Sequence, residues 1–168
     1  DVKKAVLVST DKSVSPINLY GATKLTAEKL FTAANAYNKT QFNCVRYGNV
    51  IGSRGSVIPY FLELKKQGVE AYPVTNKSMT RFWITAGEAV NLVITALSEL
   101  LPGEILIPQA KSMTMSELVY AIDPWGAIVE TGIRAGEKMH ESLCSEDNDN
   151  VRVFDGELIT KCKGNYTS

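Results

Sequence analysis

Apolar positions along the chain form two kinds of pattern, continuous runs and helical spacing. Ala5 to Val8 form a continuous, β-rich apolar run inside a strand expected at Lys4–Thr10, and a second strand is expected at Phe42–Val50. Continuous apolar runs of this length are typical of strands buried on both faces of a parallel sheet. Between the two runs, apolar residues three and four positions apart predict a helix from Leu19 to Tyr37.

Shorter elements are expected in the rest of the chain. A helix at 56–67 would end at Gly68, and capping-box sequences at 85–88 and 114–117 predict two helix starts. The other expected elements are strands at 103–108 and 127–130, a short helix at 136–143, a hairpin turning at Asp155-Gly156 and an extended, irregular segment at 71–84. Alternating strands and helices predict an α/β fold with a mainly parallel sheet and a small lobe over the carboxyl ends of its strands.

Length and composition narrow the class of protein. The chain has 168 residues, 45% hydrophobic and 21% charged, as in globular domains. Basic and acidic residues are equal in number, 18 each, so we expect no nucleic-acid partner, since phosphate binding favours excess positive charge. The apolar runs are far shorter than the roughly 20 residues that cross a bilayer, so we expect no membrane partner.

Cysteine and histidine are sparse. Three cysteines are scattered without a CxxC spacing: Cys44, Cys144 and Cys162. With His140 as the single histidine, we expect no metal site, and unpaired cysteines favour the reducing cytoplasm. Trp83 and Trp125 are expected to be packing residues, and His140 to lie on the surface of a helix.

The stretch "SPINLYGATKLTAEKL" places Tyr20 and Lys24 one helical turn apart, on one face of a helix. It follows a strand that ends in Ser9-Thr10-Asp11-Lys12, and residues just past a strand's carboxyl end face the ligand crevice of such sheets. A phenol is a poor base at neutral pH, but a nearby ammonium favours the phenolate. From spacing alone, the pair is either a packed tyrosine with a solvated lysine or a proton-transfer device.

Four segments resemble, in order, the extended short-chain dehydrogenase/reductase superfamily, and more narrowly the inverting UDP-N-acetylglucosamine 4,6-dehydratases. They are "VSTDKSVSPINLYGATK", "VRYGNVIGSRGSVIPYF", "MTRFWIT" and "GIRAGEKMHE". The resemblance covers most of Val6 to Glu141. Related retaining dehydratases carry methionine where Tyr20 stands, so Tyr20 favours the inverting branch.

The resemblance implies a catalytic role for five residues. Tyr20 would take the proton of the sugar 4-hydroxyl while hydride passes to NADP, with Lys24 holding the nicotinamide ribose and Thr10 hydrogen-bonding the same hydroxyl. Asp11 and Lys12 would remove the C5 proton and assist loss of the 6-hydroxyl as water. Hydride would return to C6 and give a 4-keto-6-deoxy sugar with C5 inverted.

Binding roles are also implied by the resemblance. The loop "GNVIGSRG" has spacing G-x3-G-x2-G without an acidic residue about 20 positions on, which disfavours a dinucleotide fingerprint. It would instead bind the UDP-sugar. The implied cofactor-binding residues are Ser9, Tyr20, Lys24, Tyr47, Gly48 and Val50. The implied substrate-binding residues are Asn49, Arg54, Ser56, Val57, Arg81, Arg134 and Glu137. For Arg81, stacking or pairing with a carboxylate stays an alternative.

The family's glycine-rich cofactor turn, GxxGxxG, does not occur in the 168 residues. We therefore expect a single truncated domain: a Rossmann-like sheet that lacks its first half, with the catalytic motif in 1–68 and mostly substrate-binding lobe in 69–168. NADP binding and catalysis by this chain alone are doubtful on this view. The first strand would have an unpaired apolar edge, so a homo-oligomer covering that edge is expected.

Three functions compete at this point. The first is a fragment of an NADP-dependent UDP-N-acetylhexosamine 4,6-dehydratase. The second is a nucleotide-sugar 4-epimerase or reductase of the same superfamily, which shares the Tyr–Lys pair but usually lacks the adjacent Asp–Lys. The third is a non-catalytic module that binds a sugar nucleotide.

Overall fold

The fold is organised around a five-stranded sheet with the strand order β1-β2-β6-β10-β9. A computed structural model describes residues 2–37, 39–145, 148–154 and 156–162. The sheet consists of β1 (Lys4–Thr10), β2 (Gln41–Tyr47), β6 (Glu104–Ile107), β10 (Glu157–Cys162) and β9 (Asn148–Phe154). The first three strands are parallel, whereas β10 and β9 form an antiparallel hairpin beside β6.

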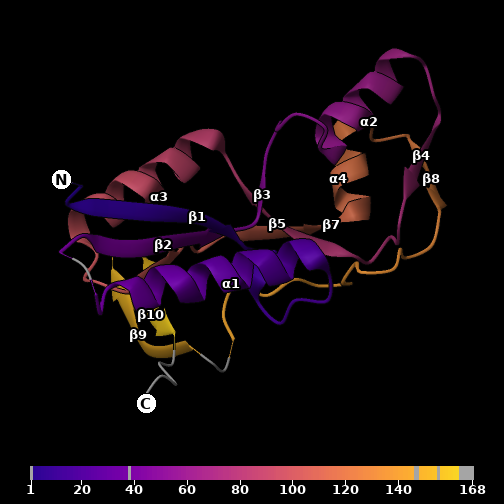
Figure 1. The fold of residues 1–168 in the computed structure, drawn as a ribbon. Coiled ribbons are helices and arrows are strands. Elements are labelled where there is room, and N and C mark those ends of the chain that lie inside the picture. Colours follow the sequence, from indigo (N-terminus) through magenta and orange to yellow (C-terminus); the bar gives the residue numbers. More distant parts are fainter. Residues whose placement is uncertain (1, 38, 146–147, 155, 163–168) are drawn as a thin grey trace.

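Helices cover both faces of the parallel strands (Figure 1). On one face, α3 (Ala86–Glu99) packs Leu92 against Val45 and neighbouring apolar residues. On the other, Phe31 of α1 (Leu19–Ala34) packs against a cluster that contains Cys44. Adjacent residues of β2, Cys44 and Val45, enter opposite clusters, so the strand is buried on both faces. The predicted α/β architecture is confirmed.

The first strand departs from the expectation of burial on both faces. Within the described residues, β1 is an edge strand with β2 as its neighbour. Its residues from Lys4 to Leu7 are partly buried, and Val8 is 41% exposed. The predicted unpaired edge is therefore present, and its carboxyl end, Ser9 and Thr10, is the buried part of the strand.

A lobe lies beyond the carboxyl ends of β1 and β2 (Figure 1). Its elements are β3 (Asn49–Val50), α2 (Val57–Lys66), β4 (Ala71–Val74), β5 (Thr80–Ile84), β7 (Lys111–Thr114), α4 (Met115–Ile122) and β8 (Ala127–Glu130). These form a three-stranded sheet, β3-β5-β7, and a parallel pair, β4-β8. A separate core around Phe61, Tyr72 and Val119, all fully buried, holds the lobe together.

Several expected boundaries differ from the observed ones. The strand at 42–50 is interrupted at Gly48, the helix at 19–37 ends at Ala34, and the segment 71–84 forms β4 and β5 with a turn between them. The predicted helix at 136–143 is wrong, because turns and bends occupy those residues. The strand at 127–130, both capping boxes and the final hairpin are confirmed, although Asp155 lies outside the described residues.

Two further findings concern organisation. The expected division at residue 68 does not separate sheet from lobe, because β6 and the β9–β10 hairpin belong to the sheet. In the part of the chain that the structure describes, no helix is long and apolar enough to span a membrane. Among the same residues, histidine, cysteine and carboxylate side chains form no group of three that could hold a metal ion.

Candidate active site

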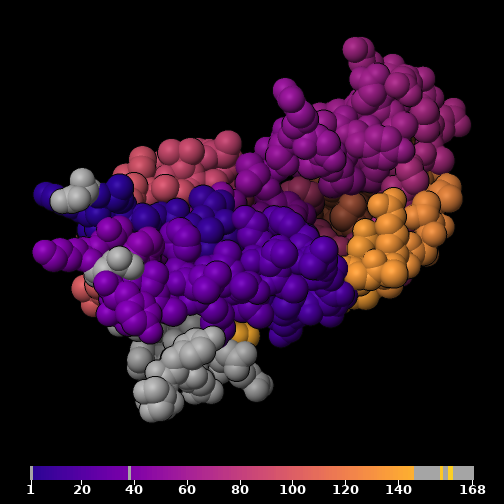
Figure 2. Space-filling view, in the orientation of Figure 1, coloured from indigo at the N-terminus to yellow at the C-terminus, as the bar shows by residue number. Residues whose placement is uncertain are grey.

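A cavity of about 720 Å³ lies where the strand ends meet the lobe. Its polar lining includes Thr10, Lys12, Asn18, Tyr20, Asn49, Arg81, Arg134, Glu137 and Glu141, and its apolar lining includes Val57, Phe61, Pro73, Val74, Met79, Trp83 and Met115. In Figure 2 the surface is hollowed between the part that carries α2 and the part formed by the N-terminal segment and residues near 130. One end of the cavity is therefore ionic and the other apolar.

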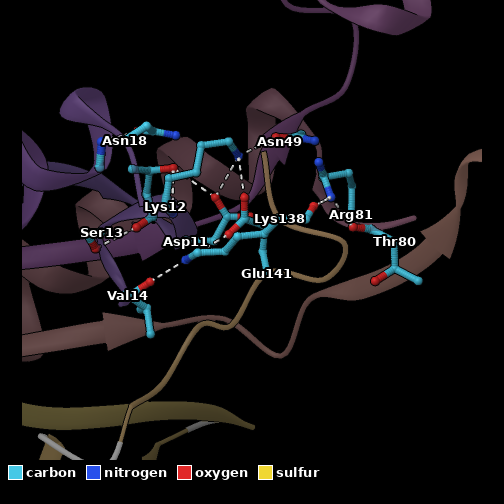
Figure 3. A network of polar contacts seen from close by, with 12 residues as sticks. Asp11, Lys12, Ser13, Val14, Asn18, Asn49, Thr80, Arg81, Lys138 and Glu141 are labelled. Carbon is cyan, nitrogen blue, oxygen red and sulfur yellow. Dashed lines mark hydrogen bonds and ion pairs between the residues drawn. The ribbon is translucent and has the colours of Figure 1, made fainter. Parts of the chain in front are cut away.

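The turn after β1 supplies the ionic end. Thr10 caps a short 3-10 helix, η1 (Asp11–Ser13), by accepting a hydrogen bond from the Lys12 amide. The Asp11 side chain is fully buried, and its Oδ1 accepts from Thr10 Oγ1 at 2.9 Å and from Lys12 Nζ at 3.0 Å. Lys12 Nζ also donates to Asn49 Oδ1 at 3.3 Å (Figure 3). Asp11 thus lies behind Lys12, and Lys12 reaches the cavity.

The start of α1 places Tyr20 at the mouth of the same cavity. Asn18 caps the helix, because its Oδ1 accepts from the Gly21 amide at 2.8 Å. Tyr20 is 53% exposed and lines the cavity. One turn later, Lys24 Nζ donates to the carbonyl of Val8 at 3.1 Å, so the lysine bridges the helix to the end of β1.

A buried ion pair fixes α1 against the sheet. Glu28, fully buried in α1, accepts from Arg46 of β2 at 3.0 Å (Nε) and 2.6 Å (Nη2). Its Oε1 also accepts from Ser13 Oγ at 2.8 Å. The bidentate contact joins α1, the helix that carries Tyr20, to β2. The hydrogen bond from Ser13 joins the same helix to the turn that carries Asp11 and so sets the spacing between the two.

The wall of the cavity continues through the break between β2 and β3. At Gly48 an added Cβ would lie 2.5 Å from Cβ of Phe82, so the chain there packs directly on β5 and only glycine fits. Just before the break, burial raises the pKa of Tyr47, and the neighbouring Tyr20 phenol adds to the shift. Opposite Asn49 in the β3–β5 pairing is Trp83, which is 7% exposed. The indole Nε1 is buried and has no hydrogen-bond partner among the described residues.

The segment 134–141 closes another side of the site. Asn18 Nδ2 donates to the carbonyl of Gly136 at 2.8 Å, and Arg81 Nη1 donates to the carbonyls of Lys138 and Met139 at 3.1 and 3.3 Å. Arg81 therefore contacts backbone carbonyls, which is neither of the contacts considered from the sequence. Glu137, on this segment, lines the cavity and has a buried Oε2 without a hydrogen-bond partner among the described residues.

Eleven residues singled out from the sequence line the cavity: Thr10, Lys12, Tyr20, Gly48, Asn49, Val50, Ser56, Val57, Arg81, Arg134 and Glu137. Five others do not: Ser9, Asp11, Lys24, Tyr47 and Arg54. Ser9 and Asp11 are buried behind the wall, whereas Arg54 is exposed. Their roles stay predictions.

Other expectations about single residues need correction or addition. Trp125 is 94% exposed and so does not pack in the interior. His140 is exposed as expected but lies outside any helix, with its Nδ1 2.8 Å from Thr80 Oγ1. Sequence reasoning missed Asn18 and Glu141 as lining residues. Asn18 could have been found from the sequence, because asparagine is a common helix N-cap and it stands two residues before the candidate Tyr20, at the same end of the helix.

Comparison with known proteins adds to this geometry. A family model described as "Polysaccharide biosynthesis protein" matches residues 1–161. A UDP-N-acetylglucosamine 4,6-dehydratase (inverting) from Campylobacter jejuni is 48% identical over 153 residues, which are 89% of this chain and 46% of that protein. A UDP-glucose 4-epimerase from Rickettsia canadensis is 41% identical over 154 residues, 88% of this chain and 45% of that protein. The chain spans about half the length of the curated relatives it matches.

Solved structures share the fold. The X-ray structure of Pen from Bacillus thuringiensis aligns with this chain with a TM-score of 0.88 and 36% sequence identity. The alignment covers 96% of this chain and 53% of the Pen chain. DesIV, a dTDP-glucose 4,6-dehydratase from Streptomyces venezuelae with NAD and TYD bound, aligns with a TM-score of 0.75 at 19% identity over 84% of this chain and 51% of its own. The predicted fold class, a Rossmann-like α/β sheet represented by about half of its length, is confirmed.

Proposed function

Because the chain belongs to the polysaccharide biosynthesis protein family, we propose that it is the catalytic and substrate-binding part of an NADP-dependent UDP-N-acetylglucosamine 4,6-dehydratase that inverts C5. The relationship to the inverting dehydratases that the four sequence segments predicted is confirmed by the Campylobacter jejuni relative. One observation carries the proposal: a single cavity is lined by Thr10, Lys12 and Tyr20 together with Arg134 and Glu137.

The proposed reaction removes one water from the sugar and leaves a 4-keto-6-deoxy product. Tyr20 takes the proton of the 4-hydroxyl. Thr10, whose hydroxyl donates to Asp11 Oδ1 in the structure, is proposed to turn and donate to the 4-oxygen as Tyr20 removes its proton. A ketone at C4 makes C5–H acidic, and elimination then needs a base at C5 and an acid at the 6-hydroxyl. We assign both proton transfers to Lys12 with buried Asp11 behind it: the pair takes the C5 proton and gives one proton to the 6-hydroxyl, which leaves as water.

The residues assigned to a nicotinamide fit that group. Tyr20, Gly48 and Val50 line the cavity, and buried Ser9 Oγ has no hydrogen-bond partner among the described residues. When bound, a nicotinamide cofactor supplies the acceptor for hydride from C4 and the donor of hydride to C6. Lys24, anchored at the carbonyl of Val8, is proposed to hold the ribose. Tyr47 borders the ring in this proposal. The choice of NADP over NAD follows from the resemblance alone.

The opposite wall is proposed to bind the UDP-sugar. Arg134 carries charge to the cavity, and guanidinium groups match diphosphate oxygens. Glu137, with its unpartnered Oε2, is proposed to accept from the uridine ribose. Asn49, Ser56, Val57 and Arg81 complete the contacts with the substrate. Arg54 joins them only if its loop moves, since it is exposed outside the cavity.

The test uses the longer protein that contains this chain. Incubation with UDP-N-acetylglucosamine and NADP, followed by mass spectrometry and proton NMR in deuterated water, should show loss of one water and deuterium at C5. Tyr20→Phe should abolish product while the variant still binds UDP in calorimetry. If the sugar nucleotide loses no water with either NADP or NAD, the proposal is refuted. UDP binding without any turnover would instead favour a non-catalytic sugar-nucleotide module.

A second candidate, a 4-epimerase, is favoured by the 41% identity with the Rickettsia canadensis protein. An epimerase would interconvert the C4 configuration without losing water. Lys12→Met separates the two candidates, because an epimerase needs Tyr20 but no acid–base group for elimination. If the variant keeps full activity on UDP-glucose or UDP-N-acetylglucosamine, the epimerase is the better description.

Association and location form part of the same proposal. We propose that a second copy covers the edge of β1, which has one neighbouring strand among the described residues. Val2 and Val8, at 67% and 41% exposure, supply apolar contacts beside that edge. The reaction is placed in the cytoplasm, where free thiols such as Cys144 stay reduced. Light scattering that gives a monomer at micromolar concentration would contradict the association.

A further inference from the structure

The cavity contains a second carboxylate beside Lys12, which the proposed reaction does not use. Glu141 lines the cavity, and its side chain is only 4% exposed. Its Oε1 lies 3.9 Å from Lys12 Nζ, and its Oε2 lies 3.3 Å from Lys138 Nζ. A carboxylate so well buried is costly unless cations balance it, so both lysines contribute to its stability.

The position of Glu141 is set by contacts that do not involve Lys12. Its segment, 134–141, is held at one side by Asn18, and at the other by Arg81. Lys138 Nζ donates to the carbonyl of Val14, at the end of η1, at 2.6 Å. Figure 3 shows Lys138 reaching Val14 beside Glu141. Contacts of the segment 134–141 therefore place the Glu141 carboxylate beside η1, within reach of Lys12.

Lys12 consequently has acceptors on different sides. Asp11 Oδ1 lies at 3.0 Å from the amine behind the cavity wall, Asn49 Oδ1 at 3.3 Å on the β3 side, and Glu141 Oε1 at 3.9 Å. With Asp11 as the sole carboxylate, the nearest attraction would draw the ammonium toward the buried side. A second carboxylate on the cavity side balances that attraction.

We infer that Glu141 is a positioning residue for Lys12, because its carboxylate shares the ammonium with Asp11 and keeps it at the cavity wall. The inference rests on the proposed function only for the proton-transfer role of Lys12; the position of Lys12 is independent of that role. It also joins two parts of the site, because the segment that presents Glu141 carries Arg134 and Glu137.

The test measures the chemical reactivity of Lys12 in the chain itself. The rate at which acetic anhydride modifies a lysine reports how freely its amine meets the reagent, so a Lys12 amine held between Asp11 and Glu141 should react slowly. Trace acetylation with light reagent, complete acetylation with heavy reagent and peptide mass spectrometry give the rate for each lysine. Glu141→Gln keeps the shape but removes the charge. It should raise the Lys12 rate about fivefold relative to exposed Lys66 and Lys77, the factor given by roughly 1 kcal/mol of lost ion pairing.

The matched control is Lys138→Met. It removes the contacts of the segment with Val14 and with Glu141 Oε2 but leaves the Glu141–Lys12 pair. Lys12 should stay slow in this variant, whereas a purely structural role of the segment would make both variants fast. Where Glu141→Gln fails to fold by circular dichroism, Glu141→Asp, with its shorter reach, should give an intermediate rate. An unchanged Lys12 rate in the folded variant overturns the inference. Absence of dehydratase activity in the longer protein leaves this result untouched and bears on the proposed function alone.

Discussion

Gly21 packs α1 directly against the turn that carries Asp11 and Lys12. A Cβ added there would lie 2.2 Å from the carbonyl oxygen of Lys12 and 3.0 Å from Cβ of Pro16. Carbon–oxygen contacts normally start near 3.3 Å, so the helix would have to move by roughly 1 Å. Because the obstacle is backbone, the neighbouring chain has little freedom to relax.

The Gly21→Ala substitution should therefore destabilise the chain. Overpacking costs about 1–3 kcal/mol, and the gain from alanine in a helix offsets up to about 1 kcal/mol of this. A net loss of about 2 kcal/mol corresponds to a fall in melting temperature of roughly 4–8 °C for a domain of this size. Thermal unfolding followed by circular dichroism measures this change.

Gly87→Ala is the control. Gly87 also lies in the first turn of a helix, α3, and an added Cβ meets nothing within 4 Å. This substitution should leave stability unchanged or raise it by up to about 1 kcal/mol through helix propensity. If Gly21→Ala proves as stable as Gly87→Ala, the close packing of α1 on the turn that carries Asp11 and Lys12 is wrong, and with it the placement of Tyr20 near that turn.

Other parts of the structure give three further outcomes. Arg46→Met should cost about 3–5 kcal/mol in urea unfolding, because it leaves buried Glu28 without its cation. Hydrogen bonds from Thr114 hold the pKa of Glu117 below its usual value of 4.5. A carboxylate whose pKa is lower in the folded state than in the unfolded state stabilises the fold at pH values above its unfolded-state pKa. That stabilisation is lost as the pH falls through the folded-state pKa. Glu117→Gln should therefore be less stable than the parent at pH 7, and the difference should vanish on acidification. In Trp125→Phe, the remaining emission should be blue-shifted and resist iodide, since Trp83 is 93% shielded whereas Trp125 is 94% exposed; emission quenched as in the parent would contradict this placement.

Elements with local signals were predictable from the sequence. The capping box at Thr85 forms as spelled, with Glu88 Oε2 accepting from the Thr85 amide at 2.7 Å. The strand Lys4–Thr10 has its expected bounds because a continuous apolar run leaves few other solutions. The capping box is satisfied within its own turn. The strand does pair with a distant segment, β2, but its own run of residues marks its bounds.

The predicted helix at 136–143 failed for a reason that lies elsewhere in the chain. Its carbonyls are taken by other segments: Asn18 donates to Gly136, Arg81 to Lys138, and the Thr80 amide to Met139 at 3.1 Å. A helix would use those carbonyls for its own amides four residues on. Tertiary hydrogen bonds therefore replaced helical ones, which spacing along the sequence does not reveal.

The same limit explains which parts of the site were visible beforehand. Thr10, Lys12 and Tyr20 follow from a strand end and the helix behind it, so proximity in sequence brings them together. Glu28 looks like an ordinary solvated helix residue, yet Arg46 makes it a fully buried anchor.

Glu141 shows the consequence most clearly. It is 129 positions beyond Lys12, in a segment without regular structure, and no role was expected for it from the sequence. It lies at the cavity only because the contacts that prevent helix formation at 136–143 hold the segment against η1. The omission of Glu141 and the wrong prediction of a helix at 136–143 thus have the same cause. The contacts that hold the backbone of such a segment therefore decide whether its carboxylate stays in solvent or, as Glu141 does, pairs with a lysine at the cavity.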